Sequence, residues 1–150
     1  MSINEKVYEK AVKLLSIRLH TTGELYDKLT TREFKKSEIL PVLKKLEELK
    51  FLDDERFAQI YVDNLKCYKD FGYYGIKAKL LKARVSSEIA ERALSEFFTP
   101  EDEAVVAKRL VAKLKRQGRN EWKKLMASLQ SRGFRSEIIR KVTDNLSLRA

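Results

Sequence analysis

The tripeptide Ser-Glu-Ile occurs three times in this chain, with its serine at residues 37, 87 and 136, so the copies are separated by 50 and 49 residues. An apolar residue lies shortly before each copy, and a leucine precedes that apolar residue by five positions. Self-similarity at a fixed period of this length is typical of stacked supersecondary units, which contact mainly their neighbours and expose an extended surface. The repeat therefore predicts one module used three times, an arrangement better suited to binding something long than to enclosing a small substrate.

Each module is expected to contain three helices, because apolar residues recur at spacings of three and four while strand patterns are weak. In the first module one apolar stripe ends near Leu19, a short one follows around Leu25, and a third begins at Ile39. The last stripe of the chain runs from Ile138 to Leu146. With only five glycines and two prolines, most of the chain is free to be helical.

The predicted fold class is therefore all-α, with three tandem three-helix modules of about 50 residues in an elongated, curved arrangement. The module limits are expected at residues 1–52, 53–98 and 99–150. A single module of about 50 residues buries too little surface to be secure alone, so stacking is expected to make the core continuous.

Several helix starts can be predicted from side chains that accept a hydrogen bond from the first helical turn. The serine of each Ser-Glu-Ile copy is expected to be such an N-cap, with the following glutamate at the positive end of the helix dipole. Asp53 is expected to cap another helix, with Leu52 and Phe57 placed around it as a hydrophobic staple. Thr99 is expected to cap a third, because Pro100 follows it at the first helical position.

The net charge of +10 is distributed unevenly along the chain. Residues 1–52 carry 11 basic and 8 acidic side chains, residues 53–98 carry 8 of each, and residues 99–150 carry 13 basic and 6 acidic ones. The three modules therefore have charges of +3, zero and +7. This pattern resembles the footprint of a protein with a nucleic-acid or anionic protein partner, although a well-solvated helical face is the competing interpretation.

The cations of the third module are the main candidates for contacting such a partner: Lys108, Arg109, Lys113, Lys115, Arg116, Arg119, Lys123 and Lys124. Residues 109, 113 and 116 are spaced to share one face of a helix, as are residues 108, 112 and 115, with an alanine in the middle of the second set. The second module adds three more candidates: Lys66, Lys69 and Lys77. A continuous stripe of this kind can follow a phosphate backbone or an acidic protein groove.

Aromatic residues alternate with some of these lysines in the second module: Tyr68, Phe71, Tyr73 and Tyr74. Exposed rings in such a setting can stack on the bases of single-stranded DNA. The favoured interpretation is that they form the packed elbow of a helical hairpin. Trp122 lies at helical spacing from Leu125 and Met126, so it is expected to pack in the core.

No arrangement of residues predicts catalysis or metal binding. The acidic run Asp53–Glu55 is better explained by helix capping than by a metal cluster, because no histidine or further carboxylate is spaced to complete the ligands. Cys67 and His20 are expected to lie in separate modules without a third orienting group, so we predict a buried or half-buried thiol rather than a nucleophile. No glycine-rich phosphate loop is present. An enzyme, a cofactor and a metal are therefore not expected.

The cellular setting follows from similar arguments. A single cysteine excludes an internal disulfide and favours an intracellular protein. The first residues contain no apolar run of the signal-peptide kind, and no stretch approaches the roughly 20 apolar residues of a membrane span. Because no heptad seam is sustained, a monomer is expected.

The segment Phe51-Leu52-Asp53-Asp54-Glu55-Arg56-Phe57-Ala58 resembles the central signature of the RecX-type regulators of the RecA recombinase. The continuation of that signature is also present, at Tyr61, Gly72, Ile76 and Leu80. In the first module, Leu14-Leu15-Ser16-Ile17-Arg18 followed by Glu24, Leu25 and Leu29 is similar to the opening helix pair of that family. In the third, Leu129-Gln130-Ser131-Arg132-Gly133-Phe134 resembles its recurring turn.

Two features depart from the family pattern. The family often has glycine in the turn before the third helix of each module, whereas this chain has Glu33 and Arg84 at two of those places, so those two turns are expected to differ in shape. Lys66 and Lys69 replace family arginines after Tyr61, which keeps the positive charge but loses bidentate geometry.

The resemblance implies a bacterial, cytoplasmic regulator of homologous recombination, DNA repair and the SOS response, without enzymatic activity or a cofactor. Such proteins lodge in the groove of the RecA–DNA filament and restrain its growth, ATP hydrolysis and strand exchange. The implied partners are the RecA filament and DNA, single-stranded, contacted directly or through the filament. The alternative is a protein that binds single-stranded nucleic acid on its own. The sign of the effect on RecA, and which module contacts RecA, stay open.

Overall fold

The computed structural model describes residues 3–147, and within them the chain forms nine helices and no strand. Side chains are described as far as residue 144, so that of Leu146 lies outside the described residues, as do residues 1, 2 and 148–150. The first helix set is α1 (Glu5–Ile17), α2 (Thr22–Thr31) and α3 (Lys36–Glu48). The second is α4 (Asp54–Tyr68), α5 (Tyr73–Lys82) and α6 (Ser87–Phe97). The third is α7 (Pro100–Arg116), α8 (Trp122–Ser131) and α9 (Ser136–Ser147).

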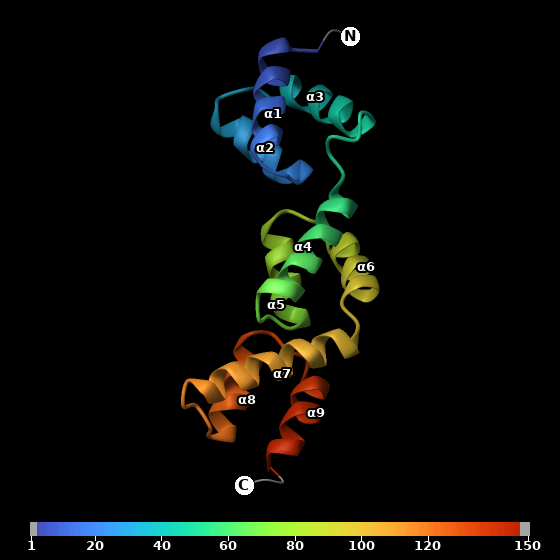
Figure 1. Cartoon of the computed structure of the whole chain (residues 1–150). Helices are drawn as coiled ribbons and strands as arrows, with labels where there is room; N and C mark the ends of the chain where they lie inside the picture. The colour runs from blue at the N-terminus through green and yellow to red at the C-terminus, as the bar shows by residue number, and fades with distance from the viewer. Residues whose placement is uncertain (1–2, 148–150) are drawn as a thin grey trace.

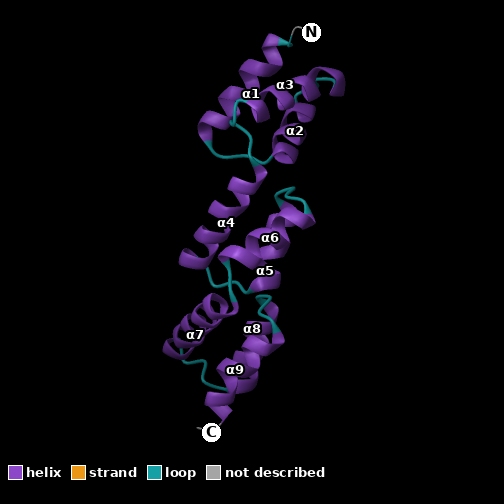
Figure 2. Ribbon diagram, turned by 90° about the vertical axis from the view of Figure 1, so that its right-hand side faces the viewer, coloured by secondary structure: helices purple, strands orange, loops and turns teal. Residues whose placement is uncertain are grey.

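The three helix sets follow one another along the molecule, from the N-terminal end at the top of Figure 1 to the C-terminal end at the bottom. The middle set lies slightly to one side of the other two, which gives the chain a gentle curve, and the view turned by 90° shows the same order (Figure 2). The predicted all-α, elongated chain of three modules is confirmed. The module limits at residues 1–52, 53–98 and 99–150 stay a prediction, and we call the three helix sets modules 1, 2 and 3.

The buried apolar side chains form two separate cores, so the prediction of one continuous core is wrong. The first core contains only residues of module 1, from Val7 to Leu52. The second runs from Phe57 to Val142 and is shared by modules 2 and 3. Leu52 and Phe57 lie in different cores and therefore do not act as a staple. The stacking argument failed here because the hydrogen bonds and the ion pair between modules 1 and 2 involve polar groups and the two modules share no apolar cluster.

Two of the three predicted kinds of helix cap are confirmed. The Asp53 carboxylate accepts from the Arg56 N–H at 3.1 Å, and the Thr99 hydroxyl accepts from the Asp102 N–H at 3.2 Å with Pro100 as the first helical residue. The serines of the Ser-Glu-Ile copies are not N-caps. Each lies inside its helix, because α3 begins one residue before Ser37, and α6 and α9 begin at Ser87 and Ser136. The Ser-Glu-Ile pattern therefore located the starts of these helices but did not identify the residue that caps each of them.

The turn before the third helix has the same form in all three modules, so the expectation that two of these turns differ in shape is wrong. Glu33, Arg84 and Gly133 have φ values of 68°, 70° and 80°. In each turn the apolar residue that follows donates its N–H to the carbonyl of the leucine five residues earlier, as in a Schellman motif. The three donor–acceptor pairs are Phe34–Leu29 at 3.4 Å, Val85–Leu80 at 3.0 Å and Phe134–Leu129 at 3.2 Å. The leucine spacing in the sequence repeat is therefore the signature of this helix end.

Replacing Glu33 with glycine is expected to raise the free energy of unfolding by about 0.5–1 kcal/mol, because a side chain in the left-handed region costs about 1–2 kcal/mol and glycine avoids most of it. Urea unfolding of Glu33→Gly measures the change. The control is Glu9→Gly, at an exposed position inside α1, where a loss of about 0.5–1 kcal/mol is expected. If Glu33→Gly lowered the free energy of unfolding as much as Glu9→Gly does, the left-handed backbone at Glu33 would carry no strain.

Candidate protein and nucleic-acid interface

The candidate cations between residues 108 and 116 are positioned by α7, which buries one apolar face and leaves the remainder to solvent. Val106, Ala107, Leu110 and Leu114 pack into the core shared by modules 2 and 3. On an α-helix of 3.6 residues per turn, the opposite side then carries the polar residues. Residues 109 and 113 lie on the flank that meets module 2, whereas residues 108 and 115 lie on the other flank. The predicted first set is therefore only partly engaged: residues 109 and 113 meet module 2, whereas residue 116, which shares their face by spacing, has no partner among the described residues.

Two of the candidate cations are used inside the protein. Arg109 donates to the Asp70 carboxylate at 3.0 Å and to the backbone carbonyls of Lys66 and Lys69 at 2.9 and 2.6 Å. Lys66 donates to the Phe97 carbonyl at 3.1 Å and lies 3.6 Å from the Asp102 carboxylate. These contacts tie the end of α4 to the start and middle of α7, so both side chains hold module 2 against module 3.

Three further candidates have weaker internal partners. The Lys113 ammonium lies 3.5 Å from Asp70, and the Lys124 ammonium lies 3.7 Å from Glu121. Lys77 donates to Glu91 at 2.8 Å, and this hydrogen bond raises the pKa of Lys77 and lowers the pKa of Glu91. Of these three pairs, Lys124–Glu121 is exposed on both sides, and a partner can replace a pair of that kind at small cost.

The other six candidates have no hydrogen bond or ion pair to their side chains among the described residues. They are Lys69, Lys108, Lys115, Arg116, Arg119 and Lys123. Lys115 is half-buried and the other five are exposed. Five of them lie along α7, in the α7–α8 connection or at the start of α8 (Figure 1). We call these five, residues 108, 115, 116, 119 and 123, the free cations of module 3.

The aromatic residues near the end of α4 are divided between core and surface. Tyr73 and Phe71 pack against the shared core, and the charges of Lys79 and Arg132 lie 4.5 and 5.5 Å from the centre of the Phe71 ring. Tyr68 and Tyr74, in contrast, are 80% and 57% exposed. The packed-elbow interpretation therefore holds for the first pair and is wrong for the second.

Two predictions of burial are wrong. Trp122 is 37% exposed because it is the first residue of α8, and the core positions of that helix are taken by Leu125 and Leu129. Cys67 is exposed, on the last turn of α4, where Leu65 takes the inward position. In both cases the helix was predicted correctly, but the sequence did not show which of its residues face the core.

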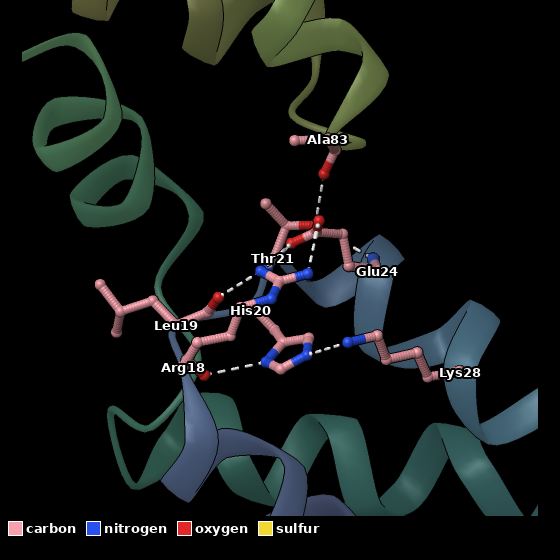
Figure 3. A network of polar contacts seen from close by, with 7 residues as sticks. All are labelled: Arg18, Leu19, His20, Thr21, Glu24, Lys28 and Ala83. Carbon is pink, nitrogen blue, oxygen red and sulfur yellow. Dashed lines mark hydrogen bonds and ion pairs between the residues drawn. The ribbon is translucent and has the colours of Figure 1, made fainter. Parts of the chain in front are cut away.

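His20 belongs to a structural network and not to a catalytic one. Its ring is buried, with Nδ1 2.9 Å from the Arg18 carbonyl and Nε2 2.7 Å from the Lys28 ammonium (Figure 3). Burial lowers the pKa of His20, which keeps the ring neutral so that Nε2 can accept from Lys28. Among the described residues no group of three histidine, cysteine or carboxylate side chains is placed to hold a metal ion. Nor is any helix in that part of the chain long and apolar enough to cross a membrane.

The sequence argument missed Glu103, a fully buried carboxylate at the centre of the joint between modules 2 and 3. One of its oxygens accepts from the backbone N–H groups of Tyr73 and Arg135 at 2.9 and 3.0 Å, and the other lies 2.6 Å from Arg135 Nε. The Arg135 guanidinium lies 4.4 Å from the centre of the Tyr73 ring. In the sequence, Glu103 follows Glu101 and Asp102 and looks like another acid near a helix start, so no local signal distinguishes it.

These features define an elongated helical-repeat protein with a cationic last module. The models of the first, second and third three-helix domains of RecX match residues 8–46, 53–94 and 103–143. The chain belongs to the RecX family of regulatory proteins.

The similarity to individual RecX proteins extends over nearly the full length of the chain. The chain is 30% identical to regulatory protein RecX of Chlorobium phaeobacteroides over 143 residues, 95% of each chain. It is 32% identical to that of Prosthecochloris aestuarii over 145 residues, 97% of this chain and 96% of the relative. The crystal structure of RecX from Lactobacillus salivarius superposes with a TM-score of 0.87 at 30% identity, covering 96% of both chains.

Proposed function

We propose that this protein binds the RecA–DNA filament and restrains its growth, ATP hydrolysis and strand exchange. Membership of the RecX family supports this function. The observation that carries it is the set of free cations of module 3, which lie on an elongated chain and have no acidic partner in the part of the chain that the structure describes. A filament is a long polymer with phosphate charge, and such a partner suits distributed contacts along an extended surface.

The rest of the proposal concerns how the protein acts and which residues form the contact surface. The protein acts by binding and not by catalysis, as a monomer in the bacterial cytoplasm, and needs no cofactor. The contact surface is centred on the free cations of module 3, with Lys69, Lys113 and Lys124 as neighbours that a partner can recruit. Lys66 and Arg109 support this surface from inside the joint between modules 2 and 3. Lys77 is paired with Glu91 inside module 2 and is the candidate that we assign the smallest part.

Removing two free cations is expected to weaken inhibition of RecA without unfolding the protein. Arg116→Gln/Arg119→Gln is expected to require about tenfold more protein for half-maximal inhibition, because two exposed charge contacts of about 0.7 kcal/mol each add to roughly one decade. The measurement is the ATPase rate of RecA on single-stranded DNA, followed by a strand-exchange assay.

The matched control is Lys44→Gln/Lys45→Gln, which removes the same charge from exposed positions near the C-terminal end of α3. Its inhibition is expected to equal that of the unaltered protein. If the unaltered protein has no effect at several-fold excess over filament sites, the proposed function is wrong. If both double variants are equally weakened, the placement of the contact surface in module 3 is wrong.

The second candidate function is binding of single-stranded nucleic acid without RecA. The exposed rings of Tyr68 and Tyr74 favour it, because such rings stack on bases and Lys69 lies directly beside the first of them. Six phosphate contacts would weaken the affinity for DNA alone by roughly a thousandfold between 50 and 200 mM salt. The test is to measure the affinity for DNA alone at both salt concentrations. An affinity that does not change with salt would exclude this function.

A further inference from the structure

The two joints between modules are built in different ways. At the joint of modules 2 and 3, the backbone N–H groups of Gly72 and Tyr74 donate to the carbonyls of Arg132 and Gly133 at 3.0 and 2.8 Å. The buried Glu103 lies beside these bonds and accepts from both modules. The apolar side chains of the two modules form one core. This interface is therefore hydrophobic, hydrogen-bonded and closely packed.

The joint of modules 1 and 2 shares no apolar core and is held by polar contacts between side chains and backbone, of which the Thr21 bond is buried. The Thr21 hydroxyl donates to the Ala83 carbonyl at 2.6 Å, and the Thr22 N–H donates to the Asp54 carboxylate at 2.9 Å (Figure 3 shows the first of these bonds). Arg84 forms an ion pair with Asp27 at 2.8 Å, and both side chains are about half exposed. The core of module 1 ends at Leu52 and has no member in module 2.

We infer that module 1 pivots as a separate body on this polar joint, while modules 2 and 3 move together as one rigid unit. Relative motion is expected between units whose interface is small and polar, and is suppressed where the interface is large and hydrophobic. Exposed ion pairs restrain such motion little, since water can replace them. The angle between module 1 and the cationic module 3 is then set by whatever the protein binds and not by the fold alone.

Spin-label distance measurements on the full chain test this inference without any partner. The exposed Cys67 is replaced by serine, and label pairs are placed at exposed positions, Lys13→Cys with Asn64→Cys for the first joint and Asn64→Cys with Arg140→Cys for the second. The distance distribution across the first joint is expected to be about twice as broad as that across the second. Equal widths, or a broader distribution across the second joint, would overturn the inference.

A charge reversal adds a second readout. Asp27→Lys places two cations against each other at the first joint and is expected to broaden or shift the 13–64 distribution while leaving the 64–140 distribution unchanged. The control is Glu91→Lys, which makes the same reversal opposite Lys77 inside module 2 and is expected to change neither distribution. If Asp27→Lys left the 13–64 distribution unchanged, Asp27–Arg84 would not be part of the pivot. Neither result depends on the proposed action on RecA.

Discussion

Glu103→Ala is expected to lower the free energy of unfolding of modules 2 and 3 by about 3–5 kcal/mol, the range found when one partner of a buried charge pair is removed. The variant leaves the Arg135 guanidinium without its carboxylate and leaves the backbone N–H groups of Tyr73 and Arg135 without an acceptor. One nitrogen of that guanidinium, Nη2, is already buried and has no hydrogen-bond partner among the described residues. Urea unfolding followed by the fluorescence of Trp122, the only tryptophan, measures the loss.

The control for this variant is Glu101→Ala, two residues earlier in the same first turn of α7. Both glutamates interact with the helix dipole, which is worth about 0.3–1 kcal/mol. Glu101 is exposed, so its removal is expected to cost only that amount. A loss of the same size in both variants would mean that Glu103 acts as a dipole partner and not as the centre of the joint.

Gly133→Ala is expected to cost about 2–5 kcal/mol, because two penalties act at one position. The residue has a φ of 80°, where a side chain costs about 1–2 kcal/mol. Its added methyl group would also overlap the backbone of Gly75 in module 2, and overpacking of this kind costs about 1–3 kcal/mol. The same urea experiment measures the sum.

Gly118→Ala separates the two penalties. Gly118 has a φ of 83°, almost the same as Gly133, but an added methyl group there would meet no atom within 4 Å. Only the conformational cost of about 1–2 kcal/mol is therefore expected. If the two alanine variants lost the same stability, the close approach of modules 2 and 3 at Gly133 would not contribute.

The repeated helix end shows how far the sequence could be interpreted. The spacing of leucine and apolar residue was visible as a repeat, and it corresponds to the N–H of Phe34, Val85 or Phe134 bonding back to a leucine carbonyl. The absence of glycine at Glu33 and Arg84 was interpreted as a different turn. That inference is wrong because Glu33 and Arg84 adopt the same positive φ as glycine, and the backbone hydrogen bonds of the turn are formed as at Gly133.

The candidate interface was predictable in composition but not in detail. Charge density along the sequence identified the third module, and helical spacing divided its cations into two sets. The sequence contained no sign that Arg109 is bound to Asp70, a residue 39 positions away, whereas Arg116 has no partner among the described residues. Pairing over such a distance depends on which helices meet, and that is decided by packing.

The amino-acid sequence by itself determined the local structure of this protein: the helical stripes, the capped starts at Asp53 and Thr99, the threefold repeat and the excess of positive charge in the last module. These properties follow from the spacing of apolar residues and from side-chain chemistry within one or two helical turns. The tertiary structure alone decided that modules 2 and 3 share a core around Glu103 while module 1 keeps its own. The reason is that contacts between modules join residues some 30 to 60 positions apart, and whether such a contact is apolar or polar depends on which surfaces meet.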